Sequence, residues 1–305
     1  MPESGFDYDF IVIGSGFGGS VSAHRLTEKG YRVAVMEMGL RWRTQDFPTT
    51  NWRIWRWIWR PKLALRGFFN MEPFRHVVIL HGCAVGGGSI TYANTLLVPP
   101  DRVWGNGSWA GLADWQNEMP AHFATAMRML GVATNRVLGP ADHILRRAAE
   151  AIGRGDTFYP TNVAVFEGDI EGVTCPDPYF GGEGPERTTC IGCGGCMIGC
   201  RYNAKNTLDL NYLYLAEKHG ARVFPETRVV GVRPLGNLDG SDGYEVRTVK
   251  STAWLFRQPR RFTCRGVILA ASALGTMDLL FRLKQNGSLP DISGCLGSRV
   301  RTNAE

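Results

Sequence analysis

The 305-residue sequence has no long hydrophobic run, no internal repeat and no low-complexity tract. No stretch reaches the roughly 18 apolar residues that a membrane-spanning helix needs, and the first residues lack the basic segment of a secretory signal. We therefore expect neither a spanning segment nor secretion. A cytoplasmic location is the default expectation, with peripheral membrane association as an alternative raised by a tryptophan-rich segment.

The excess of basic over acidic residues is also small. The net charge is +6, and part of it comes from the local run at residues 41–66 rather than from a uniform basic face. Nucleic-acid binding is therefore not expected. With 44% hydrophobic and 20% charged residues, the chain has the composition of a globular protein with one large or two medium domains.

The first ordered pattern is a short apolar run followed at once by a glycine loop. Residues 10–13 read as a strand buried on both faces, and residues 14–19 read Gly-Ser-Gly-Phe-Gly-Gly. Gly14 would permit the tight turn, Gly16 would let the backbone approach a pyrophosphate, and Gly19 would let the next helix pack on the strand. The pattern predicts a dinucleotide site at a helix N-terminus.

An acidic residue completes this unit. Residues 32–36 form a second apolar strand, and Glu37 follows it about 20 residues after the glycines. A carboxylate at that point can accept a hydrogen bond from a ribose hydroxyl and would repel a 2′-phosphate. The unit alone does not choose between NAD and FAD.

Two further segments have the same character. Three successive glycines at residues 86–88 precede Ser89, which indicates either backbone pressed against a flat or anionic group or a plain strand-entry loop. Residues 266–280 read as a buried strand, a turn of small residues beginning at Ala270, and a helix. Small residues at that turn would allow close approach to a bound dinucleotide.

The pattern between these ends differs. Helices are predicted near residues 115–130, 142–152 and 208–218, and strands at 222–226, 228–232, 243–256 and 261–270. We therefore predict an α/β fold: a Rossmann-like three-layer domain with an insertion. Residues 1–98 and 203–305 would form its two parts, and residues 99–202 would be an incomplete substrate domain.

One segment combines tryptophan with arginine. Residues 51–61 hold Trp52, Trp55, Trp57 and Trp59 together with three arginines. The segment is either a loop or short helix whose indoles cover the domain while guanidiniums stack on them, or a contact with a membrane surface. Such a contact would suit an apolar substrate drawn from a bilayer.

The three small-residue motifs, in this order, resemble those of the glucose–methanol–choline (GMC) family of flavoprotein oxidoreductases, and most of all its bacterial cholesterol-oxidase-type members. The resemblance covers essentially the whole chain and implies FAD. The cofactor-binding residues that we predict from it and from the motifs are Gly14, Ser15, Gly16, Phe17, Gly18, Gly19, Glu37, Gly86, Gly87, Gly88, Ser89, Asn94, Val229 and Ala271. Val229 matches a position whose backbone meets the adenine in this family.

The resemblance also implies a reaction. Family members move a hydride from an alcohol carbon to flavin N5, a histidine helps to take the hydroxyl proton, and oxygen or another acceptor reoxidises the flavin. The implied substrate is a hydrophobic alcohol, with a sterol expected. The alternatives are an NAD-linked dehydrogenase and a noncatalytic flavin or iron–sulfur electron-transfer module.

The catalytic histidine of the family lies in a C-terminal part of the chain. The histidines of this sequence match no such motif: His24, His76, His81, His122, His143 and His219. The sequence stops at residues 301–305, after a strand-like segment and without a closing element. We therefore expect a truncated chain whose catalytic histidine lies beyond residue 305, whose turnover is in doubt and whose FAD affinity is weakened.

Four of the eight cysteines form a run. Cys190, Cys193, Cys196 and Cys200 have the spacing of bacterial ferredoxin ligands, although Arg201 stands where ferredoxins place a proline. The run predicts a metal site, with an iron–sulfur cluster, zinc and reduced structural cysteines as the open alternatives. A cluster would give electrons from the flavin a route to an acceptor other than oxygen.

Overall fold

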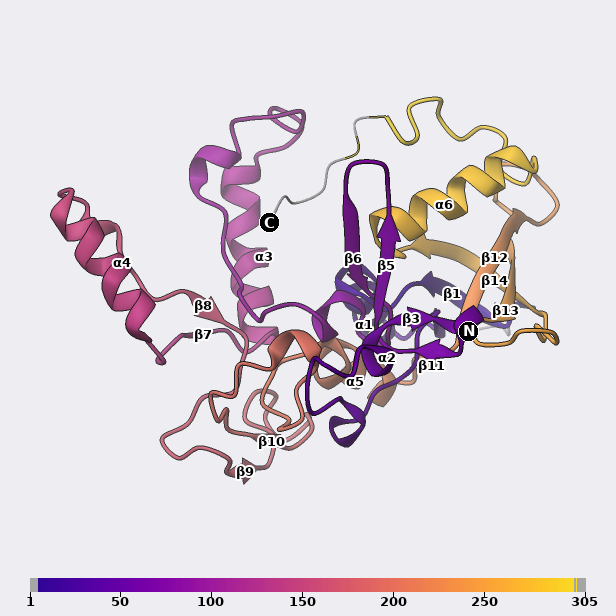
Figure 1. Cartoon of the computed structure of the whole chain (residues 1–305). Helices are drawn as coiled ribbons and strands as arrows, with labels where there is room; N and C mark the ends of the chain where they lie inside the picture. The colour runs from indigo at the N-terminus through magenta and orange to yellow at the C-terminus, as the bar shows by residue number, and fades with distance from the viewer. Residues whose placement is uncertain (1–4, 299, 301–305) are drawn as a thin grey trace.

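A six-stranded mixed sheet forms the centre of the computed structural model, which describes residues 5–298 and 300 (Figure 1). In spatial order the strands are β11 (Arg222–Phe224), β2 (Val33–Met36), β1 (Tyr8–Ile13), β14 (Arg260–Leu269), β13 (Tyr244–Lys250) and β12 (Thr227–Pro234). The pairs β11–β2, β2–β1 and β1–β14 are parallel, and the other two are antiparallel. Strands from both ends of the sequence thus share one sheet.

Alternate residues of β1 supply the two cores of this sheet. Ile11 and Ile13 pack in one cluster and Val12 packs in another, as the two-residue period of a strand requires. Helices α1 (Phe17–Glu28) and α5 (Tyr212–Lys218) pack against each other and contribute to the cluster around Val12, whereas α6 (Ser272–Gln285) contributes to the cluster around Ile11. The chain has the predicted Rossmann-like α/β architecture.

Smaller elements lie outside the sheet. Helices α3 (Trp115–Met129) and α4 (Pro140–Ala151) stand on the left of Figure 1, away from the sheet. The short strands are β3 (Trp59–Arg60), β4 (Leu65–Arg66), β5 (Phe69–Pro73), β6 (Val78–Gly82), β7 (Ala133–Thr134), β8 (Asn162–Val163), β9 (Thr174–Cys175) and β10 (Arg187–Thr188). The β5–β6 pair is an antiparallel hairpin that projects upward in Figure 1.

Most predicted elements are confirmed, and two are altered. Helices α3 and α4 lie where they were predicted, but α5 begins only at Tyr212, after a 3₁₀ turn at Leu208–Leu210. The strand prediction for residues 243–256 is wrong beyond Lys250, because the chain turns there and residues 254–256 are exposed. Residues 301–305, on which the prediction of a truncated chain rests, lie outside the described residues.

The tryptophan-rich segment forms the short helix α2 (Ile54–Trp57) and strand β3. Trp59 is buried, and the half-buried Trp57 ring packs edge-on against Phe69, so these two indoles cover the domain and the predicted membrane contact is wrong for them. Trp52 and Trp55 are exposed. In the part of the chain that the structure describes, none of the helices combines the length and apolarity needed to cross a membrane.

Candidate cofactor site

The three small-residue loops touch one another backbone to backbone. A Cβ atom added to Gly87 would lie 2.6 Å from the Cα of Gly16, which joins the second loop to the first. A Cβ added to Gly14 would lie 2.3 Å from the carbonyl oxygen of Ala270 and 2.9 Å from the Cα of Ala271. The first loop is therefore also in contact with the third loop, at Ala270. These separations leave no room for a side chain, so the sequence can bring the loops together only with glycine.

Gly19 has a separate reason to lack a side chain. A Cβ there would lie 2.0 Å from the carbonyl oxygen of Gly14 and 3.2 Å from Val12, on the strand that α1 covers. This matches the packing role predicted for it. Phe17, Gly18 and Gly88 face more open space: Phe17 is exposed, nothing lies within 4 Å of a Cβ on Gly18, and only the Phe17 ring comes within 4.0 Å of one on Gly88.

Ser15 connects the first loop to the acid and to the second loop. Its hydroxyl donates to Oε2 of Glu37 over 2.6 Å, and its backbone N–H donates to the same oxygen over 3.1 Å. The hydroxyl oxygen also accepts from the backbone N–H of Gly86 over 3.1 Å. Ser15 is fully buried, so this link is formed away from solvent.

Glu37 is buried as well, and burial raises the pKa of its carboxyl above the ordinary value. The hydrogen bonds from Ser15 and from the N–H of Gly39, which lies 2.8 Å from Oε1, act in the opposite direction. A carboxylate accepts about four hydrogen bonds. The Ser15 hydroxyl and the N–H groups of Ser15, Gly39 and Met38 already act on this one, so the predicted ribose contact of Glu37 stays a prediction.

The side chain of Ser89 has a structural task. Its hydroxyl donates to the carbonyl of Gly86 over 2.7 Å and accepts from the N–H of Leu208 over 2.9 Å, and the residue is fully buried. This arrangement commits the hydroxyl to holding the second loop. Any cofactor contact of Ser89 would have to be made by its backbone.

Asn94, at the end of the second loop, is held in the left-handed region with φ 59°. Its amide lies 2.9 Å from the sulfur of Cys196. The second glycine loop and the cysteine run are therefore direct neighbours, although about a hundred residues separate them in the sequence.

Lys205 reinforces that neighbourhood, and sequence reasoning missed it. The side chain is fully buried, and Nζ donates to the carbonyls of Ile90 over 2.9 Å and Cys196 over 2.8 Å. The ammonium also lies 4.5 Å from the ring centre of Tyr92. Burial lowers the pKa of Lys205 to about 8. No periodic pattern marks a lysine that is buried by long-range contacts.

The metal prediction for Cys190, Cys193, Cys196 and Cys200 is not supported. The four cysteines line a cavity of about 190 Å³, but within residues 5–298 and 300 no three His, Cys, Asp or Glu side chains are grouped to hold a metal ion. The sulfur of Cys196 accepts from Asn94, and that of Cys200 accepts from two backbone N–H groups. None of the four forms a disulfide in the described residues.

The remaining predicted positions are Val229, in β12, and Ala271, in the turn between β14 and α6. The Val229 side chain is part of the core cluster with Ile11 and Met36, so only its backbone is available to a ligand. Ala271 precedes α6 and lies against Gly14. Val229 and Ala271 thus come from different elements of the core that supports the loops.

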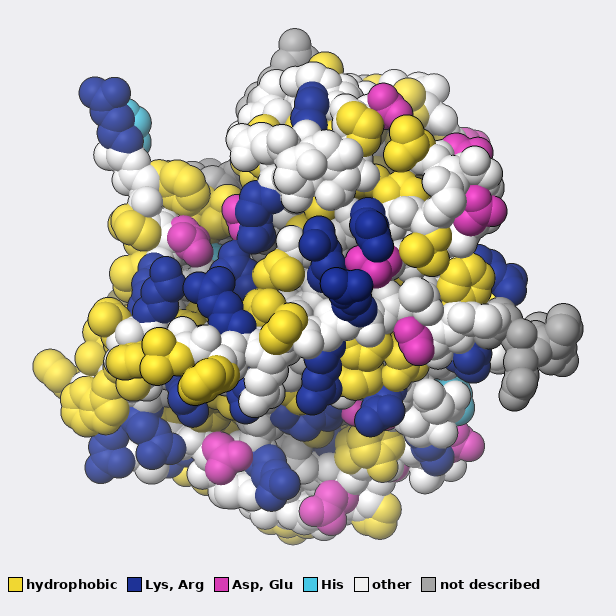
Figure 2. Space-filling model, turned by 90° about the vertical axis from the view of Figure 1, so that its right-hand side faces the viewer, with side chains coloured by type: hydrophobic (Ala, Val, Ile, Leu, Met, Phe, Trp, Pro, Cys, Tyr) yellow, Lys and Arg dark blue, Asp and Glu magenta, His cyan; other side chains and the backbone are white. Residues whose placement is uncertain are grey.

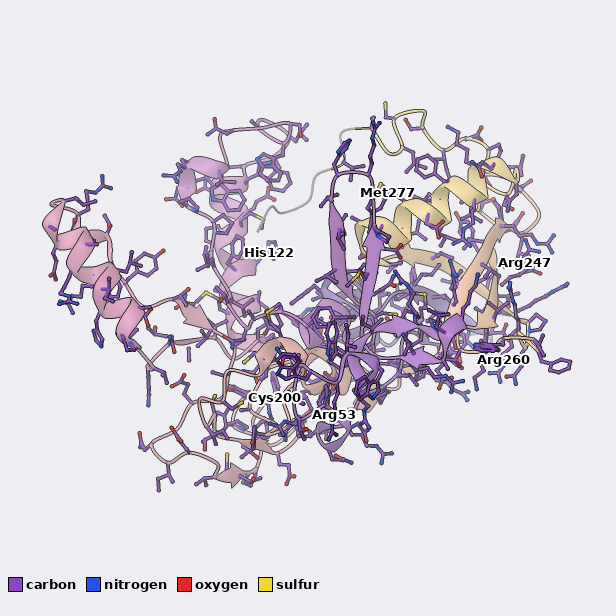
Figure 3. All side chains as sticks on the ribbon, viewed as in Figure 1. Arg53, His122, Cys200, Arg247, Arg260 and Met277 are labelled. Atoms are coloured by element: carbon purple, nitrogen blue, oxygen red, sulfur yellow. The ribbon has the colours of Figure 1, made fainter. Side chains whose placement is uncertain are left out.

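The histidines have other surroundings. His24 on α1 lies 3.3 Å from Glu28 and stacks on His219, and the His81 ring lies 3.0 Å from the amide of Asn70. His122 lies on α3, outside the sheet (Figure 3). The contacts of His24, His81 and His219 give these side chains no role at the glycine loops.

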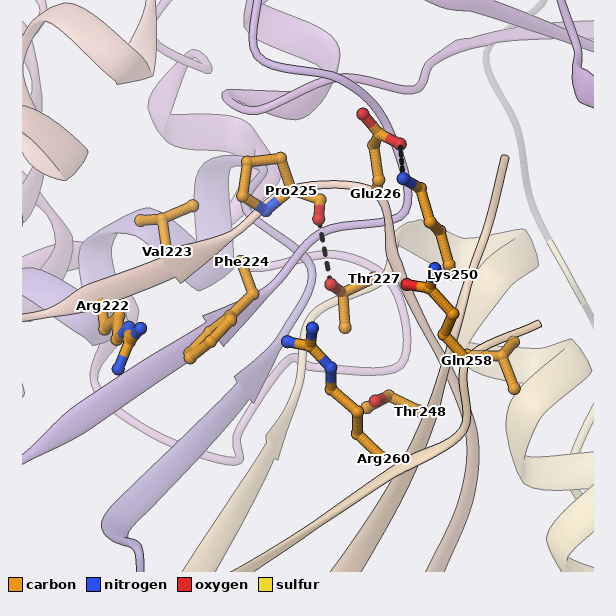
Figure 4. Close-up of a pocket in the computed structure, with 11 residues that line it drawn as sticks. Arg222, Val223, Phe224, Pro225, Glu226, Thr227, Thr248, Lys250, Gln258 and Arg260 are labelled. Carbon is orange, nitrogen blue, oxygen red and sulfur yellow. Dashed lines mark hydrogen bonds and ion pairs between the residues drawn. The ribbon is translucent and has the colours of Figure 1, made fainter. Parts of the chain in front are cut away.

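A larger cavity than the one beside the cysteines lies elsewhere. It has a volume of about 390 Å³ and lies along β11, the start of β12 and the β13–β14 connection, with Arg222, Lys250 and Arg260 among its lining residues (Figure 4). The predicted cofactor residues do not line it. We therefore base the candidate site on the contacts between the loops rather than on cavity size.

Comparison with known proteins agrees with this arrangement. The profile of a family described as an NAD(P)-binding Rossmann-like domain matches residues 12–77, which include the first glycine loop and Glu37. A cholesterol oxidase of Acinetobacter baumannii is 63% identical over 309 aligned residues, which cover 100% of this chain and 56% of that protein. A cholesterol oxidase of Mycobacterium tuberculosis (strain CDC 1551 / Oshkosh) is 49% identical, over 98% of this chain and 52% of that protein.

A third relative, from the same Mycobacterium tuberculosis strain, is an uncharacterised GMC-type oxidoreductase that is 29% identical over 72% of this chain and 32% of its own length. The chain is thus similar to cholesterol oxidases and, more distantly, to a GMC-type oxidoreductase. It spans about half the length of the two cholesterol oxidases that it matches. The predicted family resemblance is confirmed, and the three converging loops are the candidate cofactor site.

Proposed function

We propose that this chain binds FAD and belongs to an oxidoreductase that oxidises the CH–OH group of a hydrophobic alcohol, with a sterol as the preferred substrate class. The observation that carries the proposal is the backbone contact of Gly14 with Ala270 and of Gly16 with Gly87. An NAD-binding unit would need only the first loop, whereas an extended flavin dinucleotide gives all three a purpose. The names of the cholesterol oxidase relatives support the substrate class.

The first loop would bind the negative end of the cofactor. Gly16 and Gly18 precede or begin α1, whose first backbone N–H groups have no partner within the helix and favour an anion. The pyrophosphate would lie there. The adenosine ribose would lie at Glu37, and the adenine would meet the backbone of Val229.

The second loop would border the flavin ring. Gly87 and Gly88 present backbone without side chains, and Asn94 is fixed by Cys196 at the end of the loop. A bound flavin supplies a hydride acceptor for the alcohol carbon. The chain's own part is to hold that ring against the loop and to exclude water. We assign no catalytic base within the described residues.

The domain division follows the same logic. Residues 1–98 and 203–305 would hold the cofactor, since they supply the six-stranded sheet and all the loops. Residues 99–202, with α3 and α4, would form part of the substrate side. Oxygen or another acceptor would complete the reaction.

The purified chain offers a direct test. We expect a flavin absorption spectrum, and heat-released cofactor that co-elutes with FAD in chromatography. A colourless preparation that binds NAD would overturn the proposal. In a second experiment, anaerobic addition of a sterol to the protein should bleach the flavin. A stable flavin that no sterol or long-chain alcohol bleaches would leave FAD binding intact and refute the alcohol chemistry for this chain.

A further inference from the structure

The cysteine run has no task in the proposed function, yet its four thiols share one cavity. Cys190, Cys193, Cys196 and Cys200 all line the space of about 190 Å³, and Cys200 is labelled in Figure 3. Within residues 5–298 and 300 these side chains are not grouped to hold a metal ion. Thiols that lie around one cavity can still react with one another, because two of them can be oxidised to a disulfide.

The thiols are close enough to influence one another electrostatically. Burial raises the pKa of Cys190 and of Cys196, and the neighbouring thiols of the run raise both pKa values further. Each thiol of the run therefore has others near it.

Backbone N–H groups hold two of the four sulfurs. The sulfur of Cys200 accepts from the N–H of Ala204 over 3.3 Å and from that of Lys205 over 3.4 Å. The sulfur of Cys190 accepts from the N–H of Gly192 over 3.4 Å. Cys190 and Cys200 are therefore fixed by the main chain, which leaves Cys193 and Cys196 as the pair that can rearrange.

Cys193 is the thiol of this pair that solvent reaches. It is exposed, and its sulfur has no hydrogen-bond partner among the described residues. A Cβ built on Gly195 would lie 3.6 Å from this sulfur, so the side chain folds back toward the turn Cys196–Ile198. The partly buried Cys196 begins that turn. An exposed thiol thus precedes a sheltered one, two residues apart in the intervening chain.

The backbone on both sides of Cys193 can adjust. Gly192 and Gly194 have φ values of 63° and 68°, and nothing lies within 4 Å of a Cβ built on either. Glycine leaves the left-handed region at little steric cost. Cys193 can therefore approach Cys196 to the length of a disulfide bond, about 2.05 Å, while the rest of the run keeps its place.

The walls of the cavity favour a small uncharged oxidant. Lys and Arg side chains are frequent on the face shown in Figure 2, but the charged residue among those that line this cavity is the acid Glu167. An anionic disulfide such as glutathione disulfide would meet that carboxylate and find no cation to offset it. A hydroperoxide carries no charge and is small enough for the cavity.

We propose that Cys193 and Cys196 form a redox-active dithiol whose oxidant is a small hydroperoxide. The sulfur of Cys193 attacks the terminal oxygen, so that an S–O bond forms, the O–O bond breaks and an alcohol or water leaves. The sulfur of Cys196 then attacks the sulfenic acid: the S–S bond forms, the S–O bond breaks, and water leaves with the Cys196 proton. The two thiols lose two electrons, and the hydroperoxide gains them.

This reaction reaches the second glycine loop. The sulfur of Cys196 accepts from the amide of Asn94 over 2.9 Å, and turning it toward Cys193 breaks that contact at the end of the loop. The site itself does not rest on the proposed function. An alcohol oxidation with oxygen as the acceptor would supply the oxidant, because it releases hydrogen peroxide.

Peptide mass spectrometry of the oxidised protein tests the proposal. Dilute, fully reduced protein is treated with an equimolar amount of hydrogen peroxide, and the remaining thiols are alkylated. The four cysteines of the run lie on one tryptic peptide, residues 188–201, so fragmentation must assign the bond. We expect a disulfide between Cys193 and Cys196 that dithiothreitol reverses. Cys295 is the internal control, because it is exposed but lies outside the run and should stop at a sulfenic acid that dimedone labels.

Two variants separate the steps of the reaction. Cys196→Ser should leave Cys193 as a sulfenic acid that dimedone labels, whereas wild-type Cys193 should label far less than Cys295. The matched control Cys200→Ser also removes a thiol of the run, but it should keep the disulfide. The wild-type bond decides the question even where a variant fails to fold. The proposal is overturned if that bond joins any other cysteines, or if dimedone labels wild-type Cys193 as fully as Cys295.

Discussion

The hydroxyl of Ser15 lies 2.6 Å from Oε2 of Glu37, and both residues are buried. The same hydroxyl accepts a hydrogen bond from the N–H of Gly86. One small side chain therefore fixes the acid after β2 relative to both glycine loops. Burial raises the pKa of the Glu37 carboxyl, and the hydrogen bonds donated by Ser15 and Gly39 oppose this shift. The ionised form of Glu37 therefore depends on these hydrogen bonds.

Replacing Ser15 with Ala should therefore destabilise the protein. The change leaves the N–H of Gly86 without its acceptor and removes one donor from a buried carboxylate, which costs about 1–3 kcal/mol. Urea unfolding followed by circular dichroism would measure this loss. Ser22→Ala is the matched control. Ser22 lies seven residues after Ser15, and its hydroxyl donates to the carbonyl of Gly18 at an exposed position. Equal stabilities for the two variants would contradict the role of Ser15.

Gly87 and Gly88 should respond differently to the same added methyl group. In Gly87→Ala the new Cβ would lie 2.6 Å from Gly16 at φ +54°, whereas in Gly88→Ala its nearest neighbour is the Phe17 ring at 4.0 Å. We expect Gly87→Ala to separate the loops, lower the unfolding temperature and reduce flavin content. Gly88→Ala should keep wild-type stability, and any flavin loss there would indicate direct contact with the cofactor. Thermal unfolding and flavin absorbance would be measured together on each variant.

The sequence predicted those parts of the site that depend on local patterns. The buried run before Gly14, the glycine order and Glu37 each follow from one short segment, and the structure has the strands and helix expected of them. The role of Ser89 and the burial of Lys205 depend on contacts across more than a hundred residues. The strand pattern of residues 243–256 also misled, because exposed Trp, Leu and Phe in a loop have the composition of a strand.

The cysteines should differ sharply in reactivity. Cys193 and Cys295 are exposed, whereas Cys83 and Cys264 are buried, and burial raises the pKa of Cys264 to about 12. A thiol reagent added to the native protein should modify the first two rapidly and spare the last two, as read by peptide mass spectrometry. In denaturant all eight thiols should titrate. Fewer than eight under reductant-free denaturing conditions would reveal a disulfide or a bound group that the structure does not show.

The buried ammonium of Lys205 should make stability depend on pH in a distinctive direction. Burial lowers its pKa from 10.5 to about 8 in the folded protein, although the nearby Cys196, Cys200 and Asp209 act to raise it. Between these values the unfolded chain binds the proton and the folded chain does not. By linkage, the free energy of unfolding contributed by this group therefore rises with pH across that window and is lowest below about pH 8.

Lys205→Met isolates this contribution, because methionine has a similar length and no titration. Relative to the variant, the wild type should gain roughly 2 kcal/mol in unfolding free energy between about pH 7.5 and pH 9.5. Urea unfolding of both proteins at each pH measures the change, and comparison within one pH cancels the titration of groups common to both. In the exposed control Lys29→Met the corresponding difference should move by less than about 0.5 kcal/mol. A difference in unfolding free energy between wild type and variant that stays constant or falls with pH would contradict this prediction. It would mean that Lys205 is hydrated rather than enclosed between the second glycine loop and the cysteine run. The contact of those two segments would then be looser than the structure has it.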